Sequence, residues 1–317
     1  MAEDKDIHNS RLELVFEKRI PGLRVTEALR HREFNMRSRH VHETIELHFL
    51  IDGHRLMFMD RETYRMDAGC AMLINHNLIH KTSTEAGFAP DHRNFILQLD
   101  RSIFDSLFRQ LGYPGFDDFG TLYCGQTRFN ENEWTLILSI IDEFKAACGE
   151  AKSMGAENTN INSYLYLQAM ELCGIYARSR RREMSTEWRL EEQKERPESV
   201  IKTGVHQKVH DIAIFLQNNA KENVSLDDIA SRFFMSKSYL TRIFRSVTGF
   251  SVVEYLKFIR IHRAQTLLKN SEMSITEIAA ACGFGNITYF EKVLKATTGV
   301  SPLQYRKQQE PRRKERE

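Results

Sequence analysis

Short apolar runs separated by turn residues dominate the first hundred residues of the chain. The runs Ile45–Ile51 and Arg55–Met59 have the length of strands, and Asp52-Gly53 between them has the composition of a turn. Strand-length runs repeated at this spacing are typical of an antiparallel sandwich or barrel. We therefore expect a β-rich domain over residues 10 to about 100.

The next eighty residues have the pattern of helices. Residues 101–111 predict a short helix, and residues 112–125, rich in Gly, Pro and Asp, predict a loop. From 130 to 148, and again from 162 to 178, the apolar residues fall on one helical face. These two stretches predict a helical hairpin whose apolar faces are too large for a pair lying free in solvent. The hairpin either dimerises or covers the β-rich domain, and we favour dimerisation.

Beyond Val205 the chain contains an internal repeat, its most informative feature. The copy SLDDIASRFFMSKSYLTRIFRSVTGFSVVEYL begins at Ser225, and the copy SITEIAAACGFGNITYFEKVLKATTGVSPLQYR begins at Ser274. With one residue inserted at Gly285, the two copies align over their whole length. A duplicated segment of this length predicts two similar units of structure.

Each copy has the start and stop signals of two helices. A Ser with an acidic residue three positions later is a capping box, and a Gly after the second helix is a left-handed stop. A small Ala in the first helix allows the second to cross closely. These signals are the caps Ser225, Ser274, Ser236 and Asn286, the acidic Asp228 and Glu277, the crossing Ala230 and Ala279, and the stops Gly249 and Gly299. A short helix, a tight turn and a second helix make a helix-turn-helix unit.

The second helix of each copy has an apolar face and a polar, basic face. The outward positions are Lys237, Ser238, Thr241, Arg242 and Arg245 in the first copy, and Ile287, Thr288, Glu291, Lys292 and Lys295 in the second. A helix from about Val252 to Lys269 separates the copies and spans roughly 25 Å. This length is near the spacing of about 34 Å between successive turns of B-DNA, so both helices can enter major grooves on one side of a duplex.

The charge of the chain is unevenly distributed. Residues 205–317 contain 18 Lys and Arg against 11 Asp and Glu, and the remaining residues contain 27 against 32. A basic part beside an acidic part suggests that only the basic part meets a polyanion. No apolar stretch is long enough to span a membrane, and the polar N-terminus lacks the apolar core of a signal peptide. The five scattered cysteines are typical of reduced thiols, so we expect a cytoplasmic protein.

Arg242 is the strongest candidate for reading a base, because its guanidinium can donate two hydrogen bonds to guanine. Lys237, Arg245 and Lys295 are better interpreted as phosphate contacts that fix register.

The repeat resembles the signature of AraC/XylS-type regulators. The resemblance covers about Val205 to Lys307 and includes Arg260-Ile261, Ile278-Ala279, Gly283-Phe284, Gly299-Val300-Ser301-Pro302 and Tyr305-Arg306. It implies a seven-helix domain with two recognition helices in successive major grooves. It also implies base-reading roles for Ser238 and Arg242 in the first copy, and for Ile287, Thr288 and Lys292 in the second. Ile287 would make an apolar contact, for example to a thymine methyl group.

The N-terminal part contains a pattern similar to the two motifs of cupin barrels. Its members are His40, His42, Glu46 and His80. In metal cupins the equivalent residues bind a divalent ion, and two His with a carboxylate suit iron, manganese or zinc. Sensor domains of the regulator family also resemble cupins and hold a small effector instead. We favour effector binding, with a metal site and a packed barrel as the alternatives.

The sequence therefore predicts an α+β multidomain protein with a cupin-like barrel, a helical hairpin and an all-α double helix-turn-helix domain. The expected segments are 1–125 for ligand sensing, 126–180 for dimerisation, 181–204 as a charged linker, 205–308 for DNA binding and 309–317 as a basic tail. We expect a transcription regulator, an activator rather than a repressor, that binds double-stranded DNA, recruits RNA polymerase and forms a homodimer. Its effector would be a sugar or related metabolite, with no cofactor and no catalytic activity.

Two other functions remain open at this point. One is a metal-dependent cupin enzyme fused to a DNA-binding module. The other is a scaffold that binds DNA without sequence preference, whose affinity would depend steeply on salt.

Overall fold

The computed structural model describes residues 12–31, 43–76, 78–154, 159–192, 200–201 and 204–314. The chain divides into two compact units, Met1–Lys202 and Thr203–Glu317. Within the described ranges, no helix combines the length and the apolar character needed to cross a membrane.

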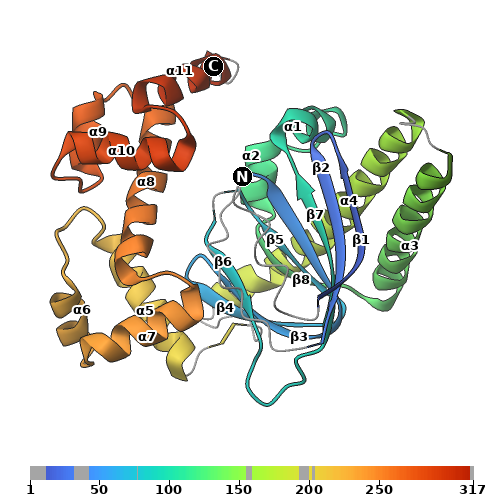
Figure 1. Ribbon diagram of the computed structural model, residues 1–317, viewed down its shortest axis with the longest axis horizontal. Coiled ribbons are helices and arrows are strands. Elements are labelled where there is room, and N and C mark those ends of the chain that lie inside the picture. Colours follow the sequence, from blue (N-terminus) through green and yellow to red (C-terminus); the bar gives the residue numbers. More distant parts are fainter. Residues whose placement is uncertain are drawn as a thin grey trace. The chain divides into compact units, whose positions relative to one another are not determined.

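The first unit is built on an antiparallel sheet with a cupin-like fold (Figure 1). The strands follow the order β1-β2-β7-β3-β5-β8, and β4 and β6 pair with β3 outside this path. Their bounds are β1 Leu12–Ile20, β2 Leu23–Arg30, β3 Ile45–Met59, β4 Glu62–Asp67, β5 Cys70–Ile74, β6 His80–Ser83, β7 His92–Leu99 and β8 Gly125–Arg128.

Strand β3 belongs to both halves of this sheet. Its first half pairs with β5 and β7, and its second half pairs with β4 and β6. The turn expected at Asp52-Gly53 is wrong, because the strand continues through these residues with a bulge between Leu50 and Asp52. Gly53 has a φ of +89°, and a Cβ there would lie 2.3 Å from the carbonyl oxygen of Asp91. A glycine at this point therefore lets β3 bend while β7 stays close.

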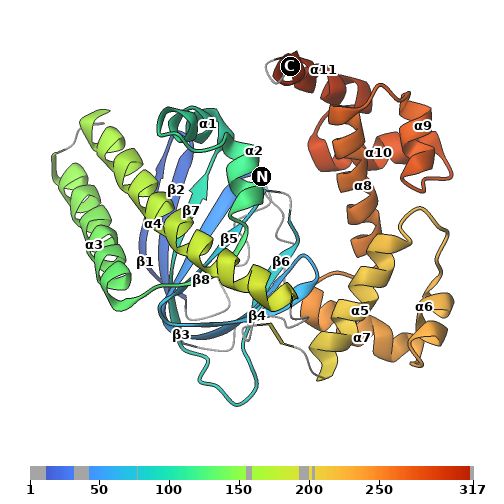
Figure 2. The ribbon, with the colours of Figure 1, turned by 180° about the vertical axis from the view of Figure 1, so that it is seen from behind.

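Four helices pack on one face of the sheet: α1 Arg101–Gln110, α2 Phe116–Leu122, α3 Glu131–Met154 and α4 Thr159–Glu192. Figure 2 shows α4 crossing this face, with α3 beside it. A single buried cluster joins Leu47 and Phe49 of the sheet to side chains of all four helices. The fully buried Glu27 of β2 pairs with Lys145 of α3 at 3.2 Å. The helical hairpin therefore covers the sheet.

Two of these helices differ from the sequence pattern. Helix α2 lies where a loop was expected, because Phe116 and Phe119 are buried against the core despite the flanking Gly and Pro. Helix α4 continues to Glu192 through residues expected to begin the linker. Arg182 donates to Glu133 of α3 at 2.9 Å, so this charged stretch is attached to the helical layer rather than only solvated.

The second unit is helical throughout its described residues. Its helices are α5 Gly204–Asn218, α6 Leu226–Arg232, α7 Lys237–Thr248, α8 Val252–Asn270, α9 Ile275–Ala281, α10 Ile287–Thr298 and α11 Pro302–Lys314. In Figure 1, α6 and α7 lie toward one end of α8, and α9 and α10 toward the other. This arrangement confirms two helix-turn-helix units separated by one long helix.

The expected caps are present in both copies. Ser225 and Ser274 each form a complete capping box, and Ser236 and Asn286 cap the second helices. Gly249 and Gly299 end those helices with the same φ of +80°. Each capping side chain accepts a hydrogen bond from a backbone N–H that the helix leaves unsatisfied, which is why these local signals locate the helix ends so well.

The turns between the paired helices use the left-handed region in both copies, at Phe234 and at Gly283. Phe234 is 97% exposed, so its side chain meets no obstacle. A Cβ at Gly283 would lie 2.7 Å from the carbonyl oxygens of both Ala220 and Lys221. The second turn therefore packs directly on the backbone of the loop between α5 and α6.

Replacing Gly283 by Ala should destabilise the second unit by about 2–3 kcal/mol, because the positive φ and the backbone contact both oppose a Cβ. Gly285→Ala is the matched control, since a Cβ there meets nothing within 4 Å. Urea unfolding followed by far-UV circular dichroism measures the difference. Equal stability of the two variants would contradict the close backbone packing.

Candidate functional sites

The outward face of α7 brings the predicted residues of the first copy together. Lys237, Ser238, Thr241, Arg242 and Arg245 line one shallow groove of about 610 Å³, together with Ser246. The opposite face of the same helix is buried through Leu240, Ile243 and Phe244. Helical periodicity alone therefore separates a packed face from a face of donors and cations.

Contacts among neighbouring side chains hold two of the cations of α7. The guanidinium carbon of Arg242 lies 5.4 Å from the ring centre of Tyr239, and the Nζ of Lys208 lies 5.5 Å from the same ring. The Nζ of Lys237 lies 3.0 Å from the exposed carboxylate of Asp227. The sequence pattern did not identify Tyr239 or Lys208. A cation over an aromatic ring is held in a restricted direction, which suits a residue that must reach one base.

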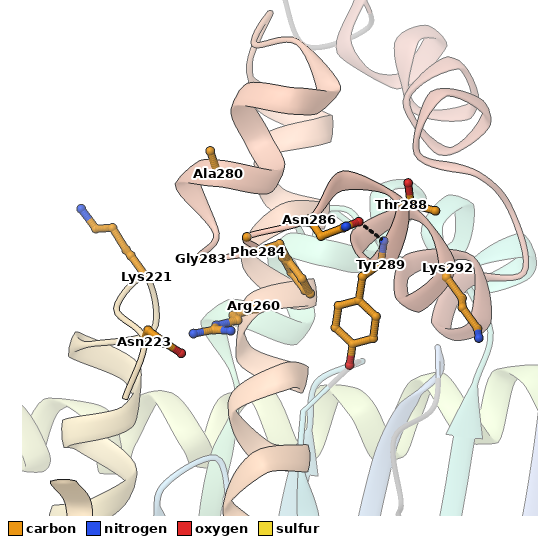
Figure 3. A pocket seen from close by; sticks show the side chains of 11 residues that line it. Lys221, Asn223, Arg260, Ala280, Gly283, Phe284, Asn286, Thr288, Tyr289 and Lys292 are labelled. Atoms are coloured by element: carbon orange, nitrogen blue, oxygen red, sulfur yellow. Dashed lines mark hydrogen bonds between the residues drawn. The ribbon is translucent and has the colours of Figure 1, made fainter. Parts of the chain in front are cut away.

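The predicted residues of the second copy are divided between two environments. Thr288 and Lys292 line a larger groove of about 920 Å³ at the start of α10, shown in Figure 3. Ile287 is 38% exposed, and Lys295 is exposed in the last turn of the helix. Neither residue lines this groove. The groove includes Asn286, the cap of α10, and residues of the α5–α6 loop that the sequence pattern did not identify.

Helix α8 has close to the length that the sequence indicated. This helix, which lies between the two helix-turn-helix units, has 19 residues and so measures about 28 Å. A partner that meets both faces must present similar features about one duplex turn apart, and B-DNA repeats its major groove about every 34 Å.

The face of the sheet opposite the helices forms the interior of the barrel. One part of it is apolar, with a buried cluster of Leu50, Met57, Met59, Met66, Met72 and Ile74. Tyr64 and Leu78 pack against this cluster. Methionine side chains adapt their shape, so this part of the interior suits contact with an apolar surface.

Another part of the interior is polar and basic. Arg30 of β2 pairs in register with His92 of β7, which also pairs with Gly53 of β3. The buried Arg55 donates to the hydroxyl of Thr84 at 2.8 Å. Burial, together with repulsion from Arg30, lowers the pKa of Arg55 to about 10. Burial and repulsion from Arg55 lower the pKa of His92 to about 4, so its ring is neutral at pH 7.

Two members of the predicted cupin set, His40 and His42, lie outside the described residues. Glu46 is buried on β3, where its carboxylate accepts from the amide of Gln98 at 3.3 Å and lies 3.5 Å from Nδ1 of His48. The Nδ1 of His80 lies 3.0 Å from the carbonyl oxygen of Leu78. Within the described part of the chain, no three His, Cys, Asp or Glu residues are grouped as metal ligands. Effector binding by this set stays a prediction.

Two family models match the chain, one in each unit. Residues 24–117 match the AraC-like ligand binding domain, and residues 229–308 match a helix-turn-helix domain. The first match covers most strands of the barrel, and the second covers both polar helix faces.

Curated relatives are similar over part of their length. The Msm operon regulatory protein of Streptococcus mutans is 35% identical over 100 residues, which are 32% of this chain and 36% of that protein. The HTH-type transcriptional activator RhaR of Cronobacter sakazakii is 38% identical over 93 residues, 29% of this chain and 33% of that one. The chain thus matches about a third of the length of these relatives. Among solved structures, the C-terminal domain of AraT, a response regulator from Geobacillus stearothermophilus, shares 30% identity with a TM-score of 0.32, covering 33% of this chain and 88% of that one.

The neutral state of His92 gives the barrel unit a pH dependence. In the unfolded chain His92 has an ordinary pKa near 6.5, so unfolding takes up a proton between about pH 6.5 and pH 4. Stability should therefore fall by about 3 kcal/mol as the pH drops through this range. His92→Asn should remove most of that fall. Urea unfolding at pH 7.0 and pH 4.5, followed by the fluorescence of Trp134 and Trp188 in this unit, measures it. The same pH dependence in variant and wild type would contradict the assignment.

Proposed function

We propose that this chain, which belongs to the AraC family of transcription regulators, binds a specific DNA sequence and responds to a small effector held in its barrel. One observation supports this most directly. Two capped helices, each with a packed face and a polar, cation-bearing face, lie one long helix apart in the basic part of the chain.

Residues on α7 and α10 divide into those that read bases and those that fix register. Arg242 is the proposed reader of a guanine in the first half-site, beside Ser238 and Thr241. Thr288 and Lys292 read the second half-site, where the exposed Ile287 contacts a thymine methyl group. Lys237, Arg245 and Lys295 contact phosphates, which gives affinity without sequence preference.

The barrel interior is the proposed effector site. It combines an apolar part rich in methionine with a polar part that includes His48, Arg55 and His92. Small-molecule sites usually have this composition, with a few placed polar groups among apolar ones. We propose a sugar or related metabolite as the effector. Its affinity must differ between arrangements that bind DNA and those that do not, because an effector that binds both equally shifts nothing.

Activation, dimerisation and location complete the proposal. The word activator in the name of the RhaR relatives supports activation, which would recruit RNA polymerase. A DNA-binding regulator acts beside the chromosome, so we propose a cytoplasmic location. Homodimerisation would use the outer side of the α3–α4 pair, where Leu136, Tyr164 and Leu167 are all at least 40% exposed.

Arg242→Ala should weaken binding to the preferred DNA site by about 1–3 kcal/mol, roughly 5- to 150-fold, and relax the preference at one base pair. The probe is the duplex that the wild-type protein selects from random sequences, and fluorescence anisotropy at fixed salt gives the affinity.

Arg61→Ala is the matched control for Arg242→Ala, because it removes one positive charge from an exposed turn of the barrel unit. It should leave affinity and sequence preference unchanged. A uniform loss of affinity for Arg242→Ala across all sequences would show that Arg242 contacts phosphate instead. Selection that yields no preferred sequence would overturn the regulator proposal.

Leu167→Glu should raise the dissociation constant of the homodimer by more than about tenfold, because Leu167 is 68% exposed at the proposed interface and a buried unpaired carboxylate is costly. Analytical ultracentrifugation over a concentration series measures this constant. Leu111→Glu, at a position 59% exposed beyond the end of α1, is the control and should not change it. An unchanged constant for Leu167→Glu would exclude this face as the interface.

A further inference from the structure

The loop between α5 and α6 is attached to the second helix-turn-helix unit, although it leads into the first. Arg260 of α8 donates from Nε to the carbonyl oxygen of Ala220 at 2.7 Å and from its terminal nitrogen to that of Glu222 at 2.8 Å. On the other side, the turn at Gly283 packs on the carbonyl oxygens of Ala220 and Lys221. The backbone of this loop is therefore fixed from two directions.

This attachment makes the loop one wall of the larger groove. Lys221 and Asn223 of the loop line the groove together with Asn286, Thr288 and Lys292 of the second helix-turn-helix unit. In Figure 3 the Arg260 guanidinium lies between the loop and Phe284, with Tyr289 and Lys292 on the opposite wall. The groove is thus lined both by residues that precede the first helix-turn-helix unit and by residues of the second recognition helix.

The lining of the groove is cationic and rich in donors. Its eleven residues include the three cations Lys221, Arg260 and Lys292 and no carboxylate. Asn223 and the hydroxyl of Tyr289 add polar groups that can donate hydrogen bonds. Burial lowers the pKa of Arg260, which is consistent with a cation held partly out of water. A surface of this composition is complementary to a chain of phosphates.

We propose that this groove holds the DNA backbone beside the second half-site, with Lys221 and Asn223 as phosphate contacts and Arg260 as the residue that positions their loop. The proposal rests on the DNA-binding function proposed above, and it adds a third contact element to the two recognition helices. DNA backbone is the occupant because the same groove includes Thr288 and Lys292 of the second recognition helix. A strand whose bases meet α10 would pass its phosphates along the loop.

Lys221→Ala tests the contact directly. The affinity for DNA should fall several-fold on the selected duplex and by the same factor on a scrambled duplex, because a phosphate contact does not depend on the base sequence. The slope of log affinity against log salt should become shallower by about 0.9, the value for one lost phosphate neutralisation. Lys307→Ala, an exposed lysine of α11 outside the groove, is the matched control and should change neither quantity. An unchanged salt slope for Lys221→Ala would overturn the proposal.

Ethylation interference shows where the contact falls. Phosphates whose ethylation blocks the wild-type protein but no longer affects Lys221→Ala must lie beside the second half-site. Loss of interference at the first half-site, or no loss at any phosphate, would contradict the placement of Lys221 beside the second half-site. Asn223→Ala should cause a smaller loss of affinity and remove the interference at a neighbouring phosphate, without changing the salt slope.

Arg260→Met tests the positioning role. The variant should weaken binding to both duplexes, and adding Lys221→Ala to it should cause little further loss, because Lys221 already fails to reach its phosphate. Circular dichroism confirms that the variant is folded. Additive losses would show that Arg260 and Lys221 act independently.

The scrambled duplex separates this proposal from the one on which it rests. If the wild-type protein prefers no sequence but Lys221→Ala still changes the salt slope, the specific regulator fails and the groove contact stands. If preference is strong and the slope does not change, the groove contact alone fails.

Discussion

The arrangement of the helical unit depends on a close contact between two backbone segments. The turn at Gly283 packs against the carbonyl oxygens of Ala220 and Lys221. Only a residue without a Cβ allows this approach, and Arg260 closes it from the other side. The contact links the segment before the first helix-turn-helix unit to the turn of the second. Because the link is made of backbone, the two recognition helices do not rely on α8 alone for their spacing. A partner with a fixed repeat, such as a duplex, then meets both helices at once.

Charged side chains of the candidate sites are exposed in one unit and buried in the other. In the helical unit the cations of α7 and α10 lie on the outward faces of the helices, where a polyanion can reach them. In the barrel unit Arg55, His48 and His92 are buried, and His92 stays neutral because Arg55 and burial oppose its protonation. Exposed cations give affinity that salt weakens, whereas buried polar groups select a ligand by the hydrogen bonds they make. This difference in placement is the physical basis for the separate roles that we propose, DNA binding in one unit and effector sensing in the other.

Sequence reasoning succeeded where structure is local and was wrong where distant contacts decide. The caps Ser225 and Ser274 and the stops Gly249 and Gly299 were predictable, because a cap depends on residues three positions away. Helix α2 was not, since Phe116 and Phe119 are held by a core formed far along the chain. The bend at Gly53 depends on β7, and the extension of α4 depends on Glu133. Periodicity also could not show which faces of β2, β3 and β7 turn inward, so Arg30, Arg55 and His92 were missed.

We place the link between the two proposed roles at β4. Val200 forms an antiparallel bridge with Tyr64, and the N–H of Ile201 donates to the carbonyl oxygen of Thr63 at 2.9 Å. The segment that leads into the second unit is therefore held by an edge strand whose Tyr64 and Met66 contact the apolar interior. An effector can act on DNA binding only through a difference in its affinity for two arrangements, and a shift from 1:99 to 99:1 requires about 5.5 kcal/mol. A strand that contacts the interior on one side and the connecting segment along its edge is where such a difference can arise, because displacing Tyr64 disturbs both contacts together.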